Sequence, residues 1–316
     1  MNNINIAYAS DNNFVQHLAV SIASLIKNHH DITNKLCIYI LDGGISLENR
    51  KKIQQLEPSN KTTQIRFILI QSANFFNEFN VFNERYPISI YYRLSLPNLL
   101  SEVDKIIYLD CDTVVISSIK ELWEIETNNA PLLAVEEPFP LNAKRLILLG
   151  LDVDAPYFNS GVLVLNLAWM RTHRCYDDFR KIANTFQHRL LYPDQDILNI
   201  YFQKLWKPIN PKFNAFFFVL QKKYINAYRS YSPILIKEAI KTPVIIHFNQ
   251  TPKPWEYGCL DYRKKLYYRY LKCTDFWKDK IGTRSDMKFL VYLKNKIFFY
   301  LENNFPFVVN IYKKLI

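Results

Sequence analysis

The stretch Lys105-Ile-Ile-Tyr-Leu-Asp-Cys-Asp-Thr-Val-Val115 decides the fold that this sequence predicts. It is a mostly apolar run that carries two carboxylates, Asp110 and Asp112. Near-continuous apolar runs are typical of strands that are buried on both faces of a parallel sheet. Side chains in extended backbone alternate between faces, so carboxylates at positions i and i+2 are expected to point the same way.

Two carboxylates on one face repel each other unless a cation lies between them. Oxygen ligands at the end of a buried strand suit a hard divalent ion that also binds substrate phosphates. The sequence therefore predicts a site for a metal and a diphosphate at Asp110 and Asp112. The alternative is that the pair only caps the end of the strand.

Short apolar strands and helical patterns alternate on both sides of this run. Strands are expected at 4–8, 36–41, 65–70, 132–135, 162–165 and 244–247, and helices at 14–26, 46–56, 92–100, 176–188 and 196–203. This order indicates βαβ units and an α/β, Rossmann-like, mostly parallel sheet flanked by helices. Ligands of such sheets bind beyond the carboxyl ends of strands, where Asp11 and Asp110 both fall.

The composition is that of a globular protein, with 49% hydrophobic and 22% charged residues over 316 positions. This length predicts one large domain and an appendage. The chain changes character near Cys259, so we expect residues 1–258 to form the α/β domain and 259–316 a basic, aromatic, helical C-terminal region.

The C-terminal region holds most of the positive charge. Residues 261–316 carry a net +8 of the chain's +11, and Arg and Lys are interleaved with aromatic side chains at 262–270 and 288–301. Such a segment suits docking to an anionic membrane surface, to which each Lys or Arg contributes on the order of 1 kcal/mol. The alternative is a helical lid over the main domain whose lysines are only solvated.

The cysteines and the N-terminus bear on the compartment. The five cysteines are scattered and form no C-x-x-C pair, which disfavours a disulfide framework or a zinc site and indicates a reducing compartment. The N-terminus lacks the basic and apolar regions of a signal peptide, and no run approaches the ~20 apolar residues of a spanning helix. A cytoplasmic location is expected.

His247 and Lys253 are candidate partners of the acidic pair. His247 ends the apolar run Val-Ile-Ile, and neutral imidazole suits Mn²⁺ better than Mg²⁺. Lys253 follows closely enough to bring an ammonium group to a diphosphate. The alternatives are a structural histidine and a solvated loop lysine.

Two polar clusters are candidates for binding a sugar. Asp194-Gln195-Asp196 precedes a helical pattern, so its alternative role is an N-cap. Asn159-Ser160-Gly161 precedes a strand; Gly161 lets the backbone approach a ligand, and the alternative is a plain turn.

Three further residues are weaker candidates. Asp11 and Asn13 follow the first strand, where they would hydrogen-bond a nucleobase and ribose or cap a helix. Arg93 would bind an anion or form a surface ion pair. The sequence contains no G-x-G-x-x-G, Walker or G-x-S-x-G motif, and no case arises for a Ser or Cys nucleophile.

Taken in order, these segments resemble retaining glycosyltransferase family 8, especially the bacterial lipopolysaccharide and lipooligosaccharide galactosyl- and glucosyltransferases. The resemblance extends from about Ile4 to Trp255. Its six segments are Ile-Ala-Tyr-Ala-Ser-Asp-Asn-Asn at 6–13, Tyr-Arg-Leu at 92–94, Tyr-Leu-Asp-Cys-Asp-Thr-Val-Val at 108–115, Tyr-Phe-Asn-Ser-Gly-Val-Leu at 157–163, Asp-Gln-Asp-Ile-Leu-Asn at 194–199, and His247 with Lys-Pro-Trp at 253–255.

The resemblance implies a GT-A fold and a retaining transfer of galactose or glucose. The donor would be a UDP-hexose, and the acceptor a sugar hydroxyl of an oligosaccharide or glycolipid of the lipopolysaccharide type. The protein would lie on the cytoplasmic face of the inner membrane, attached peripherally through its C-terminal region to anionic lipid. It would have no nucleic-acid partner, which agrees with the confinement of the charge to one end of the chain.

The resemblance also implies roles for individual residues. Asp110, Asp112 and His247 would hold Mn²⁺, with Mg²⁺ as the alternative ion. Gln195, Asp194 and Arg93 would be catalytic; an amide is a poor nucleophile, so Gln195 fits stabilisation of an oxocarbenium-like centre better than a covalent intermediate. The implied donor-binding set is Ala9, Ser10, Asp11, Asn13, Arg93, Asp110, Cys111, Asp112, Asn159, Ser160, Asp194, Gln195, Gln250 and Lys253.

The chain departs from the family pattern at some positions. Asn12 stands where Asp is frequent, and Phe-Asn-Gln-Thr-Pro at 248–252 stands where relatives often have Cys-Gly-Pro. Gln250 in place of Gly reshapes the wall of the diphosphate or acceptor site. The segment 72–89 matches no family segment and is expected on the acceptor side.

Two other enzyme activities fit parts of the sequence. Asp110-Cys-Asp-Thr-Val matches the D-x-D-x-T signature of aspartyl-phosphate phosphatases, in which Asp110 would be the nucleophile. That motif normally begins its domain, whereas three βα segments precede it here. A self-glucosylating initiator of the glycogenin type is the second alternative.

Overall fold

A mixed α/β sheet forms the centre of the computed structural model, which describes residues 2–31, 33–59, 62–71, 79, 86–138, 143–217, 219–256, 258–259, 261–278, 297 and 301. Within these residues the sheet has seven strands in the order β3-β2-β1-β4-β7-β6-β8. The strands are β1 (Asn2–Ser10), β2 (Asn34–Asp42), β3 (Thr63–Leu69), β4 (Lys105–Leu109), β6 (Leu132–Glu136), β7 (Phe158–Asn166) and β8 (Lys207–Pro208). Only the pairs β4–β7 and β7–β6 are antiparallel in this described sheet, so the prediction of a mostly parallel sheet is confirmed.

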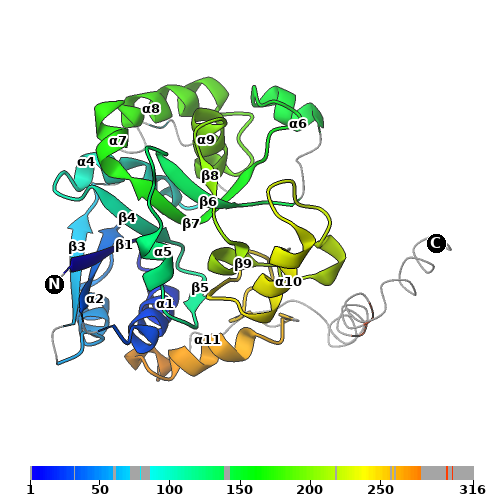
Figure 1. Cartoon of the computed structure of the whole chain (residues 1–316). Helices are drawn as coiled ribbons and strands as arrows, with labels where there is room; N and C mark the ends of the chain where they lie inside the picture. Colours follow the sequence, from blue (N-terminus) through cyan, green and yellow to red (C-terminus); the bar gives the residue numbers. More distant parts are fainter. Residues whose placement is uncertain are drawn as a thin grey trace.

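Helices cover both faces of the sheet (Figure 1). One hydrophobic core receives side chains from α1 (Val15–Asn28), α2 (Leu47–Gln54), α5 (Lys120–Glu124), α10 (Pro233–Lys241) and α11 (Lys264–Leu271). The opposite core receives side chains from α4 (Leu96–Leu99), α6 (Ala143–Leu148), α7 (Leu167–Thr172), α8 (Cys175–Phe186) and α9 (Pro193–Phe202). The 3₁₀ segments are η1 (Ile88–Ser95), η2 (Pro211–Asn214), η3 (Lys222–Tyr224) and η4 (Asp275–Trp277).

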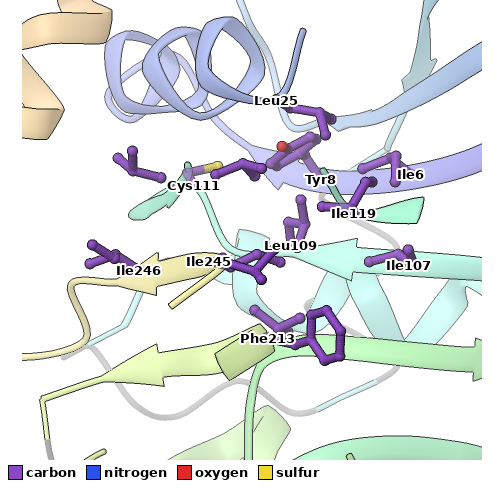
Figure 2. Close-up of a cluster of buried hydrophobic side chains, with 14 of the residues drawn as sticks. Ile6, Tyr8, Leu25, Ile107, Leu109, Cys111, Ile119, Phe213, Ile245 and Ile246 are labelled. Carbon is purple, nitrogen blue, oxygen red and sulfur yellow. The ribbon is translucent and has the colours of Figure 1, made fainter. Parts of the chain in front are cut away.

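The two cores explain why the β4 sequence is apolar without a break. Ile107 and Leu109 point into the first core, and Ile106 and Tyr108 into the second, as alternation in a strand requires. Figure 2 shows Ile6, Ile107 and Leu109 among the side chains of the first core. Both faces of β4 are therefore dry, which leaves its carboxyl end as the place for polar groups.

A second, smaller sheet accompanies the first. In the described residues it has the order β5-β10-β9, with β5 (Thr113–Val115), β9 (Ala215–Phe216) and β10 (Ile245–His247). The antiparallel pairing of β10 with β5 places His247 opposite Thr113. This pairing brings a late part of the sequence to the residue that follows Asp112.

Some elements differ from the sequence prediction. The expected helix at 92–100 is instead the 3₁₀ segment η1 followed by the short α4, which contains Pro97. β7 begins at Phe158, not at 162, so Asn159, Ser160 and Gly161 belong to a strand and the interpretation of a plain turn is wrong. Ser46 does cap α2, since its hydroxyl accepts the Asn49 N–H at 3.2 Å.

The first part of the C-terminal region packs on α1. Tyr267 of α11 is buried; its hydroxyl accepts a hydrogen bond from Gln16 at 3.0 Å and lies 2.7 Å from His17 Nδ1. Tyr270 accepts a hydrogen bond from Asn28 at 2.8 Å. α11 lies within the region 259–316 that was expected to be helical and overlaps the basic, aromatic stretch 262–270. Residues 279–316 lie outside the described residues except at 297 and 301. The division of the chain at residue 258 stays a prediction.

None of the helices in the described part of the chain combines the length and the apolar character that crossing a bilayer requires.

His17 should make the stability of this fold depend on pH. Its ring stacks on Trp255 with centroids 3.5 Å apart, and burial lowers its pKa from 6.5 to about 3. The unfolded chain therefore binds a proton near pH 6.5 that the folded chain does not bind until about pH 3. The free energy of unfolding falls as pH falls through this window, and His17 alone accounts for about 1.5 kcal/mol between pH 6.5 and about pH 5.

The measurement is urea unfolding at both pH values for the wild type and for His17→Phe. The variant should lose less stability on acidification than the wild type. His173→Phe is the matched control, because His173 stacks on Trp169 at 3.6 Å but is exposed. Equal pH dependence in the wild type and His17→Phe would contradict the prediction.

Candidate active site

The acidic pair lies in a turn between two strands. β4 ends at Leu109 and β5 begins at Thr113, and the Thr113 N–H donates to the Asp110 carbonyl at 3.2 Å. The expectation that both carboxylates lie on one face of an extended strand is therefore wrong. The turn nevertheless brings both side chains to His247.

His247 completes a cluster of three ligand-type side chains. Its Nε2 lies 3.2 Å from Asp112 Oδ1 and 3.8 Å from Asp110 Oδ2. One ligand atom from each residue lies within 4.8 Å of the others. Hard carboxylate oxygens with one imidazole nitrogen form a donor set that suits a divalent ion. Within the described structure Asp112 Oδ1 is buried and accepts no hydrogen bond, so these residues fit a cation.

Gly161 makes room for the imidazole ring. A Cβ atom at this position would lie 2.1 Å from His247 Cε1 and 2.6 Å from Nδ1. Leu163 pairs with Ala134 while Asn159 pairs with Val135, so β7 bulges at this point and directs residues 160–162 toward the site. The sequence suggested that Gly161 lets a ligand approach the backbone. In the structure the His247 ring lies in the space that a side chain at this position would fill.

Arg93 is buried, which overturns the alternative of a surface ion pair. Its guanidinium lies 2.7 Å from Asp110 Oδ1 and 3.2 Å from Asp194 Oδ2, and it donates to the Ser160 carbonyl at 2.8 Å. It also lies over the Tyr108 ring, 4.3 Å from the centroid. One buried cation thus joins the acidic turn to the start of α9.

The start of α9 faces β7. Gln195 accepts hydrogen bonds from the Ser160 N–H at 3.0 Å and the Asn159 side chain at 3.2 Å. Asp194 accepts from the Ser160 hydroxyl at 3.1 Å. Asp196 is fully buried and accepts from the N–H groups of Leu191 and Tyr192, so it fastens the chain that enters the helix. All three residues lie inside α9, whose N-cap residue is Tyr192 and has no side-chain cap hydrogen bond, so the N-cap role suggested as the alternative is wrong.

Lys253 reaches the acidic turn from the loop after β10. Its Nζ lies 2.6 Å from Asp112 Oδ2 and donates to the Phe248 carbonyl at 2.7 Å. The interpretation of Lys253 as a solvated loop lysine is therefore wrong.

The end of β1 holds the remaining donor-site candidates. The Cys111 thiol donates to the Ala9 carbonyl at 3.2 Å, and Ser10 is buried beside them. Asp11 accepts from the N–H groups of Asn13 and Phe14 in the turn before α1, whose N-cap Phe14 has no side-chain cap hydrogen bond, so the alternative of helix capping is wrong. The structure brings Ala9, Ser10 and Cys111 together; a role for Asp11 and exposed Asn13 in binding a nucleoside stays a prediction.

Gln250 lies apart from the carboxylates. It is exposed and lines a pocket of about 140 Å³ beside His247, together with Phe217, Phe248 and Asn249. The structure thus places Gln250 on the wall next to the cluster.

The pKa values of the acidic side chains in the site are shifted in opposite directions. Burial is the largest influence on Asp112 and raises its pKa, but the opposing effects of Lys253 and His247 together outweigh burial and hold the pKa well below its usual range. Burial raises the pKa of Asp194 although Arg93 opposes it. Burial likewise raises the pKa of Glu137 although a hydrogen bond from Asn159 opposes it. Asp112 therefore stays ionised, as a metal ligand must.

Two polar residues of the site, Glu137 and Asn214, were not predicted from the sequence. Glu137 accepts hydrogen bonds from Asn159 at 3.1 Å and from Gln195 at 3.4 Å. Asn214 lies 3.0 Å from His247 Nδ1. Glu137 lies two positions after the predicted strand 132–135, which resembles the signal that singled out Asp110, whereas nothing in the sequence around Asn214 marks it.

The model of glycosyl transferase family 8 matches residues 5–259 of this chain. The chain belongs to glycosyl transferase family 8. General stress protein A of Bacillus subtilis is 25% identical over 279 residues, covering 86% of this chain and 94% of that protein. Lipopolysaccharide 1,2-glucosyltransferase of Escherichia coli is 29% identical over 275 residues, covering 83% of this chain and 77% of that protein.

The fold of this glycosyltransferase also matches solved structures. The galactosyltransferase LgtC, solved with donor and acceptor sugar analogs, superposes with a TM-score of 0.76 at 25% identity. The match covers 88% of this chain and all of LgtC. The GT-A fold and the glycosyltransferase activity expected from the six segments are confirmed, and neither the phosphatase nor the self-glucosylating alternative is favoured.

The glycosyltransferase should not accept a side chain at position 161. In Gly161→Ala the new methyl group overlaps the His247 ring, and we expect a loss of about 1–3 kcal/mol in the free energy of unfolding. In a His247→Ala background the ring is gone, so the same change should cost less than about 0.5 kcal/mol. Chemical denaturation of the wild type, both single variants and the double variant measures this coupling, and additive losses would show that the ring does not fill this space.

Proposed function

We propose that this glycosyltransferase moves a galactosyl or glucosyl group, with retention, from a UDP-sugar to a sugar hydroxyl of a lipopolysaccharide- or lipooligosaccharide-type glycan. The observation that carries the proposal is the convergence of Asp110, Asp112 and His247 at the carboxyl end of β4 in a chain of this family. The names of two relatives, a lipopolysaccharide glucosyltransferase and a galactosyltransferase, support the hexose and the type of acceptor.

The residues of the cluster would bind the diphosphate through a divalent ion. Asp110, Asp112 and His247 would hold Mn²⁺, with Mg²⁺ as the alternative. When bound, such an ion acts as a Lewis acid that offsets the negative charge of a departing diphosphate. Lys253, already 2.6 Å from Asp112, would add a second positive charge on the same group.

The residues around the donor sugar favour a reaction without a covalent enzyme intermediate. Gln195 offers an amide oxygen that already accepts hydrogen bonds from Ser160 and Asn159, so it suits electrostatic stabilisation of a positive anomeric carbon. Asp194 is tied to Arg93 and to the Ser160 hydroxyl. In the proposed step the bond from the anomeric carbon to the phosphate oxygen breaks, the acceptor oxygen bonds to that carbon on the same face, and the acceptor proton passes to the leaving phosphate.

Substitution of either aspartate tests this function. Asp110→Asn and Asp112→Asn should each lower hexosyl transfer by at least about 100-fold, because each removes an ionic ligand from the diphosphate site. The measurement is transfer from radiolabelled UDP-galactose and UDP-glucose to a lipooligosaccharide acceptor, with Mn²⁺ and with a chelator. Circular dichroism should show that both variants keep the fold.

Asp104→Asn is the matched control, because Asp104 precedes the other end of β4 and its exposed carboxylate pairs with Arg171. It should transfer sugar like the wild type. Wild-type transfer by Asp110→Asn or Asp112→Asn, or transfer that a chelator leaves unchanged, would overturn the proposal. Metal-dependent phosphate release without a sugar nucleotide would favour the phosphatase instead.

We also propose that the C-terminal region attaches the enzyme to the cytoplasmic face of the inner membrane. The face of α11 that turns away from α1 exposes Lys265 and Arg269, and exposed Tyr262 and Trp277 lie near its ends. Basic and aromatic side chains on one surface suit an anionic lipid interface. The expected membrane contact at 288–301 lies outside the described residues apart from 297 and 301.

Charge reversal on this face tests the attachment. Lys265→Glu with Arg269→Glu in the full chain should weaken binding to phosphatidylglycerol vesicles by at least about 30-fold, since each basic residue contributes about 1 kcal/mol. Vesicle sedimentation measures the binding. Lys181→Glu with Lys204→Glu is the control, because both lysines are exposed and lie outside this face. Equal binding by both double variants would contradict attachment through α11.

A further inference from the structure

We propose that Asn214 is a positioning residue for His247: it holds the ring in the tautomer whose Nε2 lone pair faces Asp110 and Asp112. Asn159 in turn holds the Asn214 amide in the required orientation. This inference rests on the proposed metal site and adds two residues that control it without touching the ion.

The contact between Asn214 and His247 is fully enclosed. Asn214 has no exposed surface, His247 is 4% exposed, and Asn214 Oδ1 lies 3.0 Å from His247 Nδ1. An amide oxygen only accepts hydrogen bonds, so Nδ1 must carry the proton of the pair. In the neutral ring Nε2 then has a free lone pair, directed at carboxylate oxygens 3.2 and 3.8 Å away. Three acceptors that face one another in this way suit a cation.

The orientation of the Asn214 amide follows from its other neighbour. Its Nδ2 donates to Asn159 Oδ1 at 2.8 Å, which leaves Oδ1 for the histidine. The oxygen of Asn159 is identified independently, because it also accepts the backbone N–H of Gly161 at 3.0 Å and a backbone N–H only donates. The Gly161 N–H thus fixes the orientation of the Asn159 amide, which fixes that of the Asn214 amide and places the proton on His247 Nδ1.

The backbone brings these groups to the His247 ring. Asn214 ends η2 directly before β9, and β9 runs parallel to β10 with Ala215 beside Ile246. Gly161 of β7 also lies against the imidazole. Asn159 also donates to Gln195 at 3.2 Å and to Glu137 at 3.1 Å. One asparagine thus connects the metal ligand to the side chain proposed to face the anomeric carbon.

Metal affinity distinguishes positioning from a merely structural role. Asn214→Ala should weaken Mn²⁺ binding by about 10–100-fold, the range for loss of a partner of a metal-bound histidine. Asn214→Asp keeps an oxygen for the Nδ1 proton and should bind Mn²⁺ within about threefold of the wild type or more tightly. Free Mn²⁺ is titrated by electron paramagnetic resonance in the absence of any sugar nucleotide.

Asn166→Ala is the matched control. Asn166 ends β7 at the strand end opposite Asn159, and its side chain accepts the Trp169 N–H at 3.0 Å as the cap of α7. This substitution also removes a hydrogen-bonded asparagine, but far from the cluster, so Mn²⁺ affinity should match that of the wild type. An equal loss in Asn166→Ala and Asn214→Ala would show that general destabilisation, and not positioning, weakens the metal.

The outcomes separate this inference from the proposed function. If the wild type and Asp110→Asn bind Mn²⁺ equally weakly, the metal site itself fails. If the wild type binds through Asp110 but Asn214→Ala binds within about threefold of it, only the positioning role fails. If Asn214→Ala does not fold, ¹⁵N resonances of His247 in the metal-free wild type decide, recorded well above the ordinary imidazole pKa of about 6.5: Nδ1–H is expected, and Nε2–H would overturn the inference.

Discussion

The pairing of β10 with β5 is the constraint on which the site depends. It sets His247 opposite Thr113, and the Phe248 N–H then donates to the Asp112 carbonyl at 3.0 Å. Without this register the acidic turn would lack its imidazole, and the loop that carries Lys253 would have no fixed start. The large sheet contributes the other half, since β4 delivers Asp110 and the bulge of β7 delivers Gly161. The site is thus a junction of two sheets.

Charge balance explains why so many polar groups are tolerated in a buried place. Arg93 forms ion pairs with both Asp110 and Asp194, and Lys253 forms one with Asp112. Breaking a buried pair by removing one partner costs about 3–5 kcal/mol because an unpaired charge remains. These ion pairs also keep the carboxylates in place before any diphosphate arrives, so binding requires little rearrangement of the protein.

The sequence could predict what local patterns determine. Continuous apolar runs predicted the strands β4 and β10, and carboxylates after a buried strand indicated the site. It could not predict that Asp110 and Asp112 lie in a turn, because an i, i+2 spacing fits both a turn and a strand. Nor could it show that Arg93 is buried, since its partner Asp194 is far away in the chain. Asn214 becomes visible only through the packing of η2 on β10.

The packing of α11 connects the membrane-facing candidate to the donor-binding candidates. Tyr267 bonds His17, His17 stacks on Trp255 at 3.5 Å, and Trp255 is two residues from Lys253. α1, which carries His17, begins just after Asp11, so the same stack touches the segments expected to hold the nucleoside and the diphosphate. Because buried rings in contact resist displacement, the position of α11 and that of Lys253 are physically linked. α11 is therefore part of the framework of the site, whatever the remainder of the C-terminal region binds.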